Sequence, residues 1–223
     1  MPSYKYTYFT FKSRPEVNRL LFLLAGVEYE NNCIDHNQYW AMRSDGKLPL
    51  LQLPILETDG RIIIQSRAIQ RYLAKKFGFY GNGVEDELLI DEAVETAEEI
   101  LDYALPWIYR ELDEKKNAEI KKEYWDYHGP RLLPFLEKRL EGSTSGFFVG
   151  DSLTVADLSV FNAIDILSDC APEELTSYKK LLEHKAKIET NPKLTKYIGE
   201  RQLVPIRQTF LGIIALKEKE KSK

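Results

Sequence analysis

The order of two kinds of hydrophobic pattern constrains the fold of this chain more than any other feature. Up to about residue 80, short apolar stretches typical of strands alternate with patterns typical of helices. After a Gly-Asn-Gly at 81–83 the strand patterns stop and long amphipathic stretches take over. We therefore expect two domains, one at 1–80 that contains a sheet and one at 84–223 that is all helical, with 81–83 as the linker.

The first domain is predicted to follow the order β-α-β and then β-β-α. The predicted elements are strands at 4–10, 29–34, 55–57 and 61–64, a helix that begins at Pro15 and ends before Gly26, and a last helix that ends before Gly78. Residues 35–50 show no regular pattern, and a connection of that length favours a functional loop. A parallel crossover followed by an antiparallel hairpin is the arrangement of a thioredoxin-like domain, so the predicted fold class is α+β.

The second domain is predicted as a series of amphipathic helices. The patterns place helices at about 85–113, 118–141, 177–190, 192–200 and 205–216, and a frayed, solvated tail at 217–223. Pro106 should bend the first of these helices, and Pro130 and Pro134 should distort the second, because proline removes a helical hydrogen bond. Thr154 and Asp157 have the spacing of a capping box and predict the start of a further helix.

Composition and charge argue against several classes of function. A formal net charge of −4 argues against a nucleic-acid-binding surface. No apolar run reaches the ~20 residues that span a bilayer, and the start of the chain lacks the profile of a signal peptide. Two cysteines form no disulfide framework and three histidines show no ligand spacing, so we expect a reduced, cytoplasmic protein without a metal.

Four segments, spread over nearly the whole chain, carry a resemblance to a known family. They are YTYFTFKSRPEVNRLLF, QLPILETDG, IIIQSRAIQRYLAKKFG and the later GDSLTVADL. Together they resemble a cytosolic glutathione transferase of the sigma-like, tyrosine-type class. The resemblance implies a homodimer that uses glutathione as cosubstrate and joins its sulfur to hydrophobic electrophiles.

Tyr8 matches the catalytic tyrosine of that family. A free thiol has a pKa of ~8.5, so little of it is thiolate at neutral pH. The resemblance implies that the phenol of Tyr8 stabilises the glutathione thiolate by donating a hydrogen bond. Tyr4, Tyr6 and Tyr8 alternate along the strand, so the alternative is that Tyr8 is one more aromatic residue on a pleated face.

Arg14 matches a family arginine near the sulfur, where a fixed positive charge favours thiolate. The family usually has glycine on both sides of it, and this chain has Ser13 and Pro15. Other glutathione transferases activate the thiol with a serine at this helix start, so Ser13 is the rival of Tyr8. The alternative role of Ser13 is to cap the helix.

The resemblance also assigns the residues that hold the peptide part of glutathione. It implies a cis bond before Pro54, which presents the backbone of Leu53 to the ligand. The cysteinyl part of glutathione then pairs with Leu53 as an added strand pairs with the edge of a sheet. Gln65 and Ser66 stand at a helix start, where free N–H groups and the helix dipole favour the γ-glutamyl carboxylate. Gln52 matches a polar contact to the peptide backbone. The alternative is a tight turn followed by an ordinary serine cap.

The glycine end of glutathione is assigned to the 35–50 connection. Trp40 matches a family tryptophan there, and Arg43, Lys47 or both are the candidate basic partners of the glycine carboxylate. Leu50-Leu51 stands where the family usually has Phe-Gly, so the loop geometry is left open.

A carboxylate of the partner subunit is implied for the α-amino group of glutathione. Glu98 and Glu99 align with that position, and Glu99 of the partner subunit is the assignment. Both lie in a strongly acidic helix, so at least one of them is expected on a solvated face.

The hydrophobic electrophile is expected to bind an apolar surface between the domains. The candidates are Phe9, Phe11, Trp107, Ser159, Asn162 and Ala163, with Arg14 beside them. Positions 159, 162 and 163 carry small or polar residues where prostaglandin-converting relatives have large ones, which argues against prostaglandin D synthase activity. Most other apolar residues of these helices are expected to be core.

Other functions stay open beside conjugation. A non-catalytic ligand carrier or a lens-type structural protein is the alternative from another class, and a prostaglandin isomerase or glutathione-dependent peroxidase are the alternatives among enzymes. A thioredoxin-like redox protein is excluded, because the chain has no cysteine near residues 10–14 and no Cys-x-x-Cys.

Overall fold

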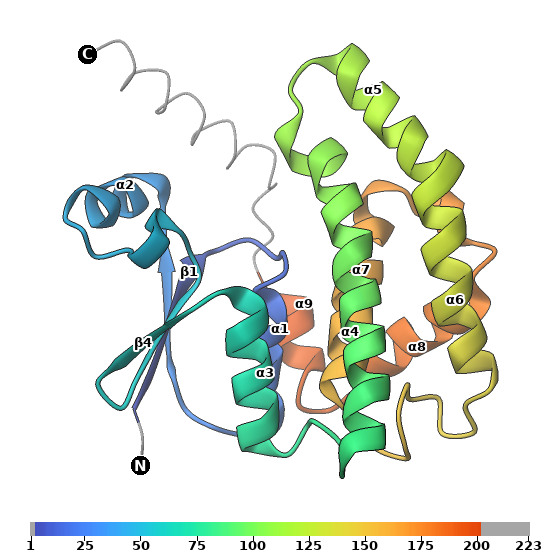
Figure 1. Cartoon of the computed structure of the whole chain (residues 1–223), viewed down its shortest axis with the longest axis horizontal. Coiled ribbons are helices and arrows are strands. Elements are labelled where there is room, and N and C mark those ends of the chain that lie inside the picture. Colours follow the sequence, from blue (N-terminus) through green and yellow to red (C-terminus); the bar gives the residue numbers. More distant parts are fainter. Residues whose placement is uncertain (1–2, 202–223) are drawn as a thin grey trace.

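The computed structural model describes residues 3–201, and its first part is built on a four-stranded sheet (Figure 1). The strands are β1 (Tyr4–Phe9), β2 (Glu30–Ile34), β3 (Ile55–Thr58) and β4 (Arg61–Ile64). Their order in the sheet is β2-β1-β3-β4, with β1 parallel to β2 and β3 antiparallel to both β1 and β4. This mixed sheet confirms the predicted crossover followed by a hairpin.

Two helices of the first part pack against each other between the sheet and the helices that follow (Figure 1). They are α1 (Glu16–Ala25) and α3 (Ser66–Phe77). Gly26 ends α1 at φ +63° and Gly78 ends α3 at φ +79°, which is the left-handed conformation that glycine adopts without strain. Both helix ends were predicted from these glycines.

The prediction that residues 35–50 are irregular is wrong. They contain α2 (His36–Ser44), which begins with a capping box. The Gln38 N–H donates to the Asp35 carboxylate at 2.9 Å, and the Asp35 N–H donates to the Gln38 side chain at 2.8 Å. None of the residues of α2 is fully buried, and only Tyr39 and Met42 of this short helix pack against the core, so its apolar pattern is weak. The Asp-x-x-Gln spacing was the available signal.

The rest of the described chain is helical. Its elements are α4 (Val84–Leu105), a π-helical turn (Pro106–Arg110), α5 (Glu114–Glu123), a second π-helical turn (Tyr124–His128), α6 (Gly129–Glu141), α7 (Val155–Cys170), α8 (Lys179–Glu189) and α9 (Thr195–Glu200). The Gly-Asn-Gly at 81–83 lies between α3 and α4, and the division into domains at that point stays a prediction. The predicted helix at 205–216 and tail at 217–223 lie outside the described residues.

Prolines explain where the long predicted helices widen into π-helical turns. The pattern at 85–113 divides at Pro106, where the first π-helical turn begins, and the pattern at 118–141 divides at the second, just before Pro130. Because proline has no N–H, the carbonyl one turn earlier loses its usual partner and the backbone widens locally. Pro134 stays inside α6.

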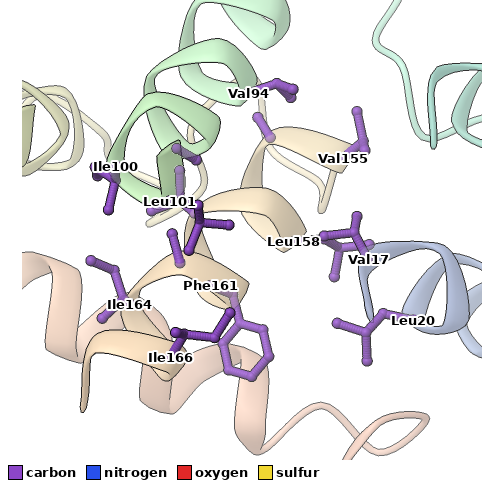
Figure 2. Close-up of a cluster of buried hydrophobic side chains, with 14 of the residues drawn as sticks. Val17, Leu20, Val94, Ile100, Leu101, Val155, Leu158, Phe161, Ile164 and Ile166 are labelled. Carbon is purple, nitrogen blue, oxygen red and sulfur yellow. The ribbon is translucent and has the colours of Figure 1, made fainter. Parts of the chain in front are cut away.

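A single hydrophobic core joins the first part to the helical part. Every residue from Val155 to Leu167 of α7 is buried, and α7 packs against α1, α3, α4 and α8. Figure 2 shows Val17 and Leu20 of α1 facing Leu158 and Phe161 of α7, with side chains of α4 on another side of α7. Residues 3–201 include no helix with the length and apolar character needed to cross a membrane.

The capping box at the start of α7 is confirmed and does more than cap the helix. The Thr154 N–H donates to the carboxylate of Asp157 at 2.8 Å. The same buried carboxylate accepts from the Phe148 N–H at 2.9 Å and contacts His184 Nε2 of α8 at 3.0 Å. Asp157 therefore fixes the loop before α7 and the helix after it.

Candidate active site

A cavity of about 830 Å³ lies between the first part of the chain and the helical part. From the first part it is lined by Tyr8, Phe9, Phe11, Ser13, Arg14, Pro15, Tyr39, Pro49, Leu50, Gln52, Leu53, Pro54, Ile64, Gln65, Ser66 and Arg67. From α4 and the turn after it, the lining residues are Asp102, Leu105, Tyr109 and Arg110. We call the first set the sheet wall and the second set the helical wall.

Tyr8 lines this cavity from the end of β1. Burial raises the pKa of its phenol above the ordinary value, and Arg19 and a hydrogen bond with Ser13 oppose only part of that rise. The Arg19 guanidinium lies 5.6 Å from the centre of the Tyr8 ring. At neutral pH the hydroxyl therefore stays protonated, and it can donate a hydrogen bond to an anion in the cavity.

Ser13 lies beside Tyr8 in the same lining. Its side chain interacts with the Tyr8 hydroxyl, and its carbonyl accepts from the Glu16 N–H at 2.9 Å and from Asn162 Nδ2 at 3.2 Å. In the described part of the chain no side chain caps the start of α1, so the hydroxyl of Ser13 is not used as a helix cap. The two candidate activators of a thiol are thus neighbours.

Four charged side chains form a network at the edge of the cavity. Glu98 of α4 is 1% exposed, and its Oε2 lies 2.8 Å from Arg14 Nε and 3.1 Å from Arg67 Nε. Asp102 pairs with both arginines, at 3.1 Å from Arg67 Nη2. Burial raises the pKa of the Glu98 carboxyl, whereas the two arginines lower it. The network fixes Arg14 and ties α4 to the start of α3.

Backbone groups dominate the part of the sheet wall that follows β2. The bond between Leu53 and Pro54 is cis, as the resemblance implied. Gln65 stands before α3 with φ +71°, a conformation that costs a residue with a side chain about 1–3 kcal/mol. Within residues 3–201 no side chain caps the start of α3, so its first N–H groups and the positive end of its dipole are available to an anion at Ser66.

The loop that carries Leu50 and Leu51 is also strained. Their φ angles are +54° and +53°, and Leu50 is 64% exposed although it lines the cavity. Tyr39 of α2 donates its hydroxyl to the Leu51 carbonyl at 3.0 Å and lines the cavity itself. Sequence reasoning missed Tyr39, because α2 was not predicted.

The structure does not bring Trp40, Arg43 or Lys47 into the cavity lining. The Arg43 guanidinium lies 5.1 Å from the Trp40 ring centre, and Arg43 donates to the Tyr39 hydroxyl at 3.2 Å. Lys47 pairs with Asp45 at 2.8 Å. The role of these three residues at the glycine end of a ligand stays a prediction.

Several other candidates also lie outside the lining. Glu99 is on the surface and pairs with Arg131 of α6 in the same chain. Ser159 accepts a hydrogen bond from Gln70 Nε2 at 2.6 Å in the interior. Asn162, Ala163 and Trp107 are buried as well, and none of the three lines the cavity.

The apolar part of the cavity is instead made by Phe9 and Phe11 with residues that sequence reasoning missed. The Phe9 and Phe11 rings stack with centres 5.4 Å apart, and Tyr8 meets Phe11 edge to face at 5.3 Å. Leu105 and Tyr109 face this cluster from the helical wall. The local signal was Pro106, because the π-helical turn after it places Tyr109 and Arg110 on the cavity.

The site combines groups that suit an anion with a surface that suits an apolar molecule. Among residues 3–201, no group of three or more His, Cys, Asp or Glu side chains could hold a metal ion. The cavity instead combines a protonated phenol, an uncapped helix start and an apolar surface. A peptide-like anion fits the first two features and an apolar molecule fits the third.

Comparison with known proteins identifies the family. Residues 4–75 match the family model described as Glutathione S-transferase, N-terminal domain, and residues 98–201 match the one described as Glutathione S-transferase, C-terminal domain. Glutathione S-transferase 3 of Caenorhabditis elegans is 34% identical over 204 residues, and S-crystallin 4 of Enteroctopus dofleini is 34% identical over 215 residues. Each alignment covers 90% of this chain and 98% of the relative.

A solved structure gives the same answer. The sigma class glutathione transferase of Fasciola hepatica superposes with a TM-score of 0.84 at 26% identity, over 92% of this chain and 99% of that one. This chain therefore belongs to the glutathione S-transferase family and resembles its sigma class.

Proposed function

We propose that this protein joins the sulfur of glutathione to electrophilic carbons of hydrophobic compounds. One observation carries the proposal: the buried, protonated Tyr8 hydroxyl lines a cavity that has a helix start on one side and an apolar wall on the other. A hydrogen bond from that hydroxyl would favour thiolate over thiol, by ~1.4 kcal/mol for each unit by which it lowers the thiol pKa. Arg14 lines the cavity near Tyr8, and we assign it a smaller contribution to the same anion, because Glu98 and Asp102 already balance most of its charge.

The sheet wall would hold the peptide part of glutathione. The backbone N–H and C=O of Leu53 suit the cysteinyl residue, and the uncapped start of α3 at Ser66 suits the γ-glutamyl carboxylate. Gln52 and Gln65 line the cavity between them. Trp40, Arg43 and Lys47 remain our assignment for the glycine end.

The reaction follows from this placement. The thiolate sulfur attacks the electrophilic carbon, a C–S bond forms, and a leaving group such as chloride departs with the electron pair of the broken bond. Holding both reactants in one cavity contributes through proximity, and the apolar wall shields the thiolate from water. We place this chemistry in the cytoplasm, in the detoxification of such compounds.

We also infer that the working form is a homodimer in which Glu99 of the partner subunit contacts the α-amino group of glutathione. In the single chain Glu99 is a surface residue paired with Arg131. This assignment therefore requires that Glu99 exchange Arg131 for the ligand when two chains meet.

Isothermal calorimetry with glutathione, together with turnover of 1-chloro-2,4-dinitrobenzene, tests the proposal. We expect binding and release of chloride, both of them saturating in glutathione. Binding without turnover would replace the proposal with the second candidate, a non-catalytic ligand carrier or structural protein. The 34% identity to an S-crystallin supports that candidate as much as a similar identity supports the enzyme. Absence of binding would contradict the proposal and the glutathione-binding carrier, and would leave the structural protein.

A further inference from the structure

Arg110 is the charged residue of the helical wall whose role the proposed function leaves open. It ends the π-helical turn Pro106–Arg110, and its side chain is exposed to the cavity that it lines. The residue next to it, Tyr109, is buried in the same wall. Arg110 therefore presents a positive charge next to an apolar surface.

The carboxylates closest to Arg110 along the chain are used elsewhere. Glu111 accepts from the backbone N–H groups of Leu112 and Asp113, both at 2.9 Å, and Asp113 caps α5 by accepting from the Lys116 N–H. Within residues 3–201, no ion pair or side-chain hydrogen bond engages the guanidinium of Arg110.

The other arginines of the cavity differ from Arg110 in this respect. Arg14 and Arg67 are each paired with Glu98 and Asp102. Their charge is largely balanced before any ligand arrives. Of the arginines that line the cavity, only Arg110 has no carboxylate partner within the described chain.

We propose that the preferred electrophile of this enzyme is an apolar molecule that carries a carboxylate, and that Arg110 binds this carboxylate. A guanidinium recognises a carboxylate through two parallel N–H···O bonds. Phe9, Phe11 and Leu105 would hold the apolar body. The carboxylates of glutathione do not need Arg110, because the residues that we assign to bind them belong to the first part of the chain. The inference rests on the proposed function and names its substrate class.

A matched pair of substrates tests the inference. We would compare 4-chloro-3,5-dinitrobenzoate with its methyl ester; in both, the thiolate forms a C–S bond at the ring carbon and chloride leaves. The quantity measured is the ratio of kcat/KM for the acid to that for the ester. We expect Arg110→Gln to lower this ratio about fivefold to tenfold, mainly through the KM of the acid, as for loss of an exposed charge-assisted hydrogen bond.

Arg61→Gln is the control, because Arg61 is an exposed arginine of β4 outside the cavity lining. Arg61→Gln removes the same charge and should leave the acid-to-ester ratio as in the wild type. Arg110→Lys should give a ratio between those of Arg110→Gln and the wild type. If the ratio is equal in wild type and Arg110→Gln, the inference is overturned. The proposed function still holds in that case, provided that the ester is conjugated. A rise in the KM of glutathione alone would also overturn it, since Arg110 would then serve the cosubstrate. If the wild type conjugates neither compound, the proposed function fails and the inference falls with it.

Discussion

The two walls of the cavity are built in different ways. The sheet wall presents backbone: a cis bond before Pro54, left-handed conformations at Leu50, Leu51 and Gln65, and an uncapped helix start. The helical wall presents side chains from α4 and one π-helical turn. Backbone N–H and C=O groups remain when a residue is substituted, so a wall built from them suits a cosubstrate that is always the same. Side chains vary freely on a helix, so the helical wall suits the choice of electrophile.

The sheet wall also contributes side chains near the end of β1, where Tyr8 serves the sulfur and Phe9 and Phe11 serve the apolar molecule. We expect Tyr8→Phe to lower kcat/KM about 100-fold, in line with the loss of one preorganised donor to a developing anion, and Ser13→Ala to have a much smaller effect. Steady-state conjugation of 1-chloro-2,4-dinitrobenzene measures both. Tyr127→Phe is the control, because Tyr127 is exposed and lies outside the cavity. A larger loss in Ser13→Ala than in Tyr8→Phe would move the chemistry to the serine.

Away from the cavity, a buried ion cluster joins the first part of the chain to α7, and its disruption should give the next largest effect. Lys12 of the first part lies 2.8 Å from Asp165 of α7, which also pairs with Arg201. We expect Asp165→Asn to lower the free energy of unfolding by about 3 kcal/mol at pH 7, because it leaves buried cations short of a partner. Urea denaturation measures this. Asp126→Asn, which breaks only the exposed pair with Lys122, should cost less than ~1 kcal/mol.

The stability that Asp165 contributes should depend on pH. Burial alone would raise its pKa, but Lys12 and Arg201 attract the carboxylate and hold the pKa below the ordinary value. A depressed pKa stabilises the folded state above the unfolded pKa of ~3.9, and this stability is lost as the pH falls through that value toward the folded pKa. The difference between wild type and Asp165→Asn should therefore shrink below about pH 4. A difference that grows in acid would contradict the assignment.

A smaller effect is expected at the helix start of the sheet wall. Ser66→Ala should weaken glutathione binding about tenfold, because the hydroxyl no longer assists the backbone N–H groups in holding a carboxylate. Calorimetry measures the Kd, and Ser177→Ala, at an exposed serine far along the chain, should leave it unchanged. Equal affinity in Ser66→Ala and wild type would place the γ-glutamyl carboxylate elsewhere.

The smallest effect should come from backbone strain. Leu51 has φ +53°, which costs a residue with a side chain about 1–2 kcal/mol and costs glycine nothing. We expect Leu51→Gly to raise the free energy of unfolding by up to about 1 kcal/mol, since glycine also gains entropy in the unfolded chain. The same change at the exposed, helical Leu88 should lower it by about 1 kcal/mol. Destabilisation in both variants would show that Leu51 is not strained.

The helices of this fold were predicted from the sequence with unequal success. Gly26, Gly78 and the Thr154-Asp157 box predicted helix ends correctly, because each acts through local backbone chemistry. The helix α2 was missed because it is short, only Tyr39 and Met42 of it pack against the core, and its cap was overlooked. Local signals thus predict boundaries even where hydrophobic periodicity is silent.

The candidate site divides in the same way. Tyr8, Pro54 and Ser66 lie in the segments that carry the family resemblance, and the structure places all three on the cavity. Trp107 and Asn162 were chosen for the helical side and are buried, whereas Arg110 was missed and lines the cavity. Which face of a helix meets a cavity depends on packing against α7 and on π-helical turns, and neither is encoded in a few neighbouring residues.

Titration of the bound thiol would show whether Tyr8 acts on the glutathione sulfur. Ultraviolet absorbance of the thiolate, followed against pH in the complex with glutathione, reports the pKa of the sulfur itself. We predict that the bound thiol titrates well below the ~8.5 of a free thiol, and that Tyr8→Phe abolishes this shift while Ser13→Ala keeps most of it. A bound thiol that titrates as it does in water would contradict the account, because the Tyr8 hydroxyl would then not be stabilising a thiolate.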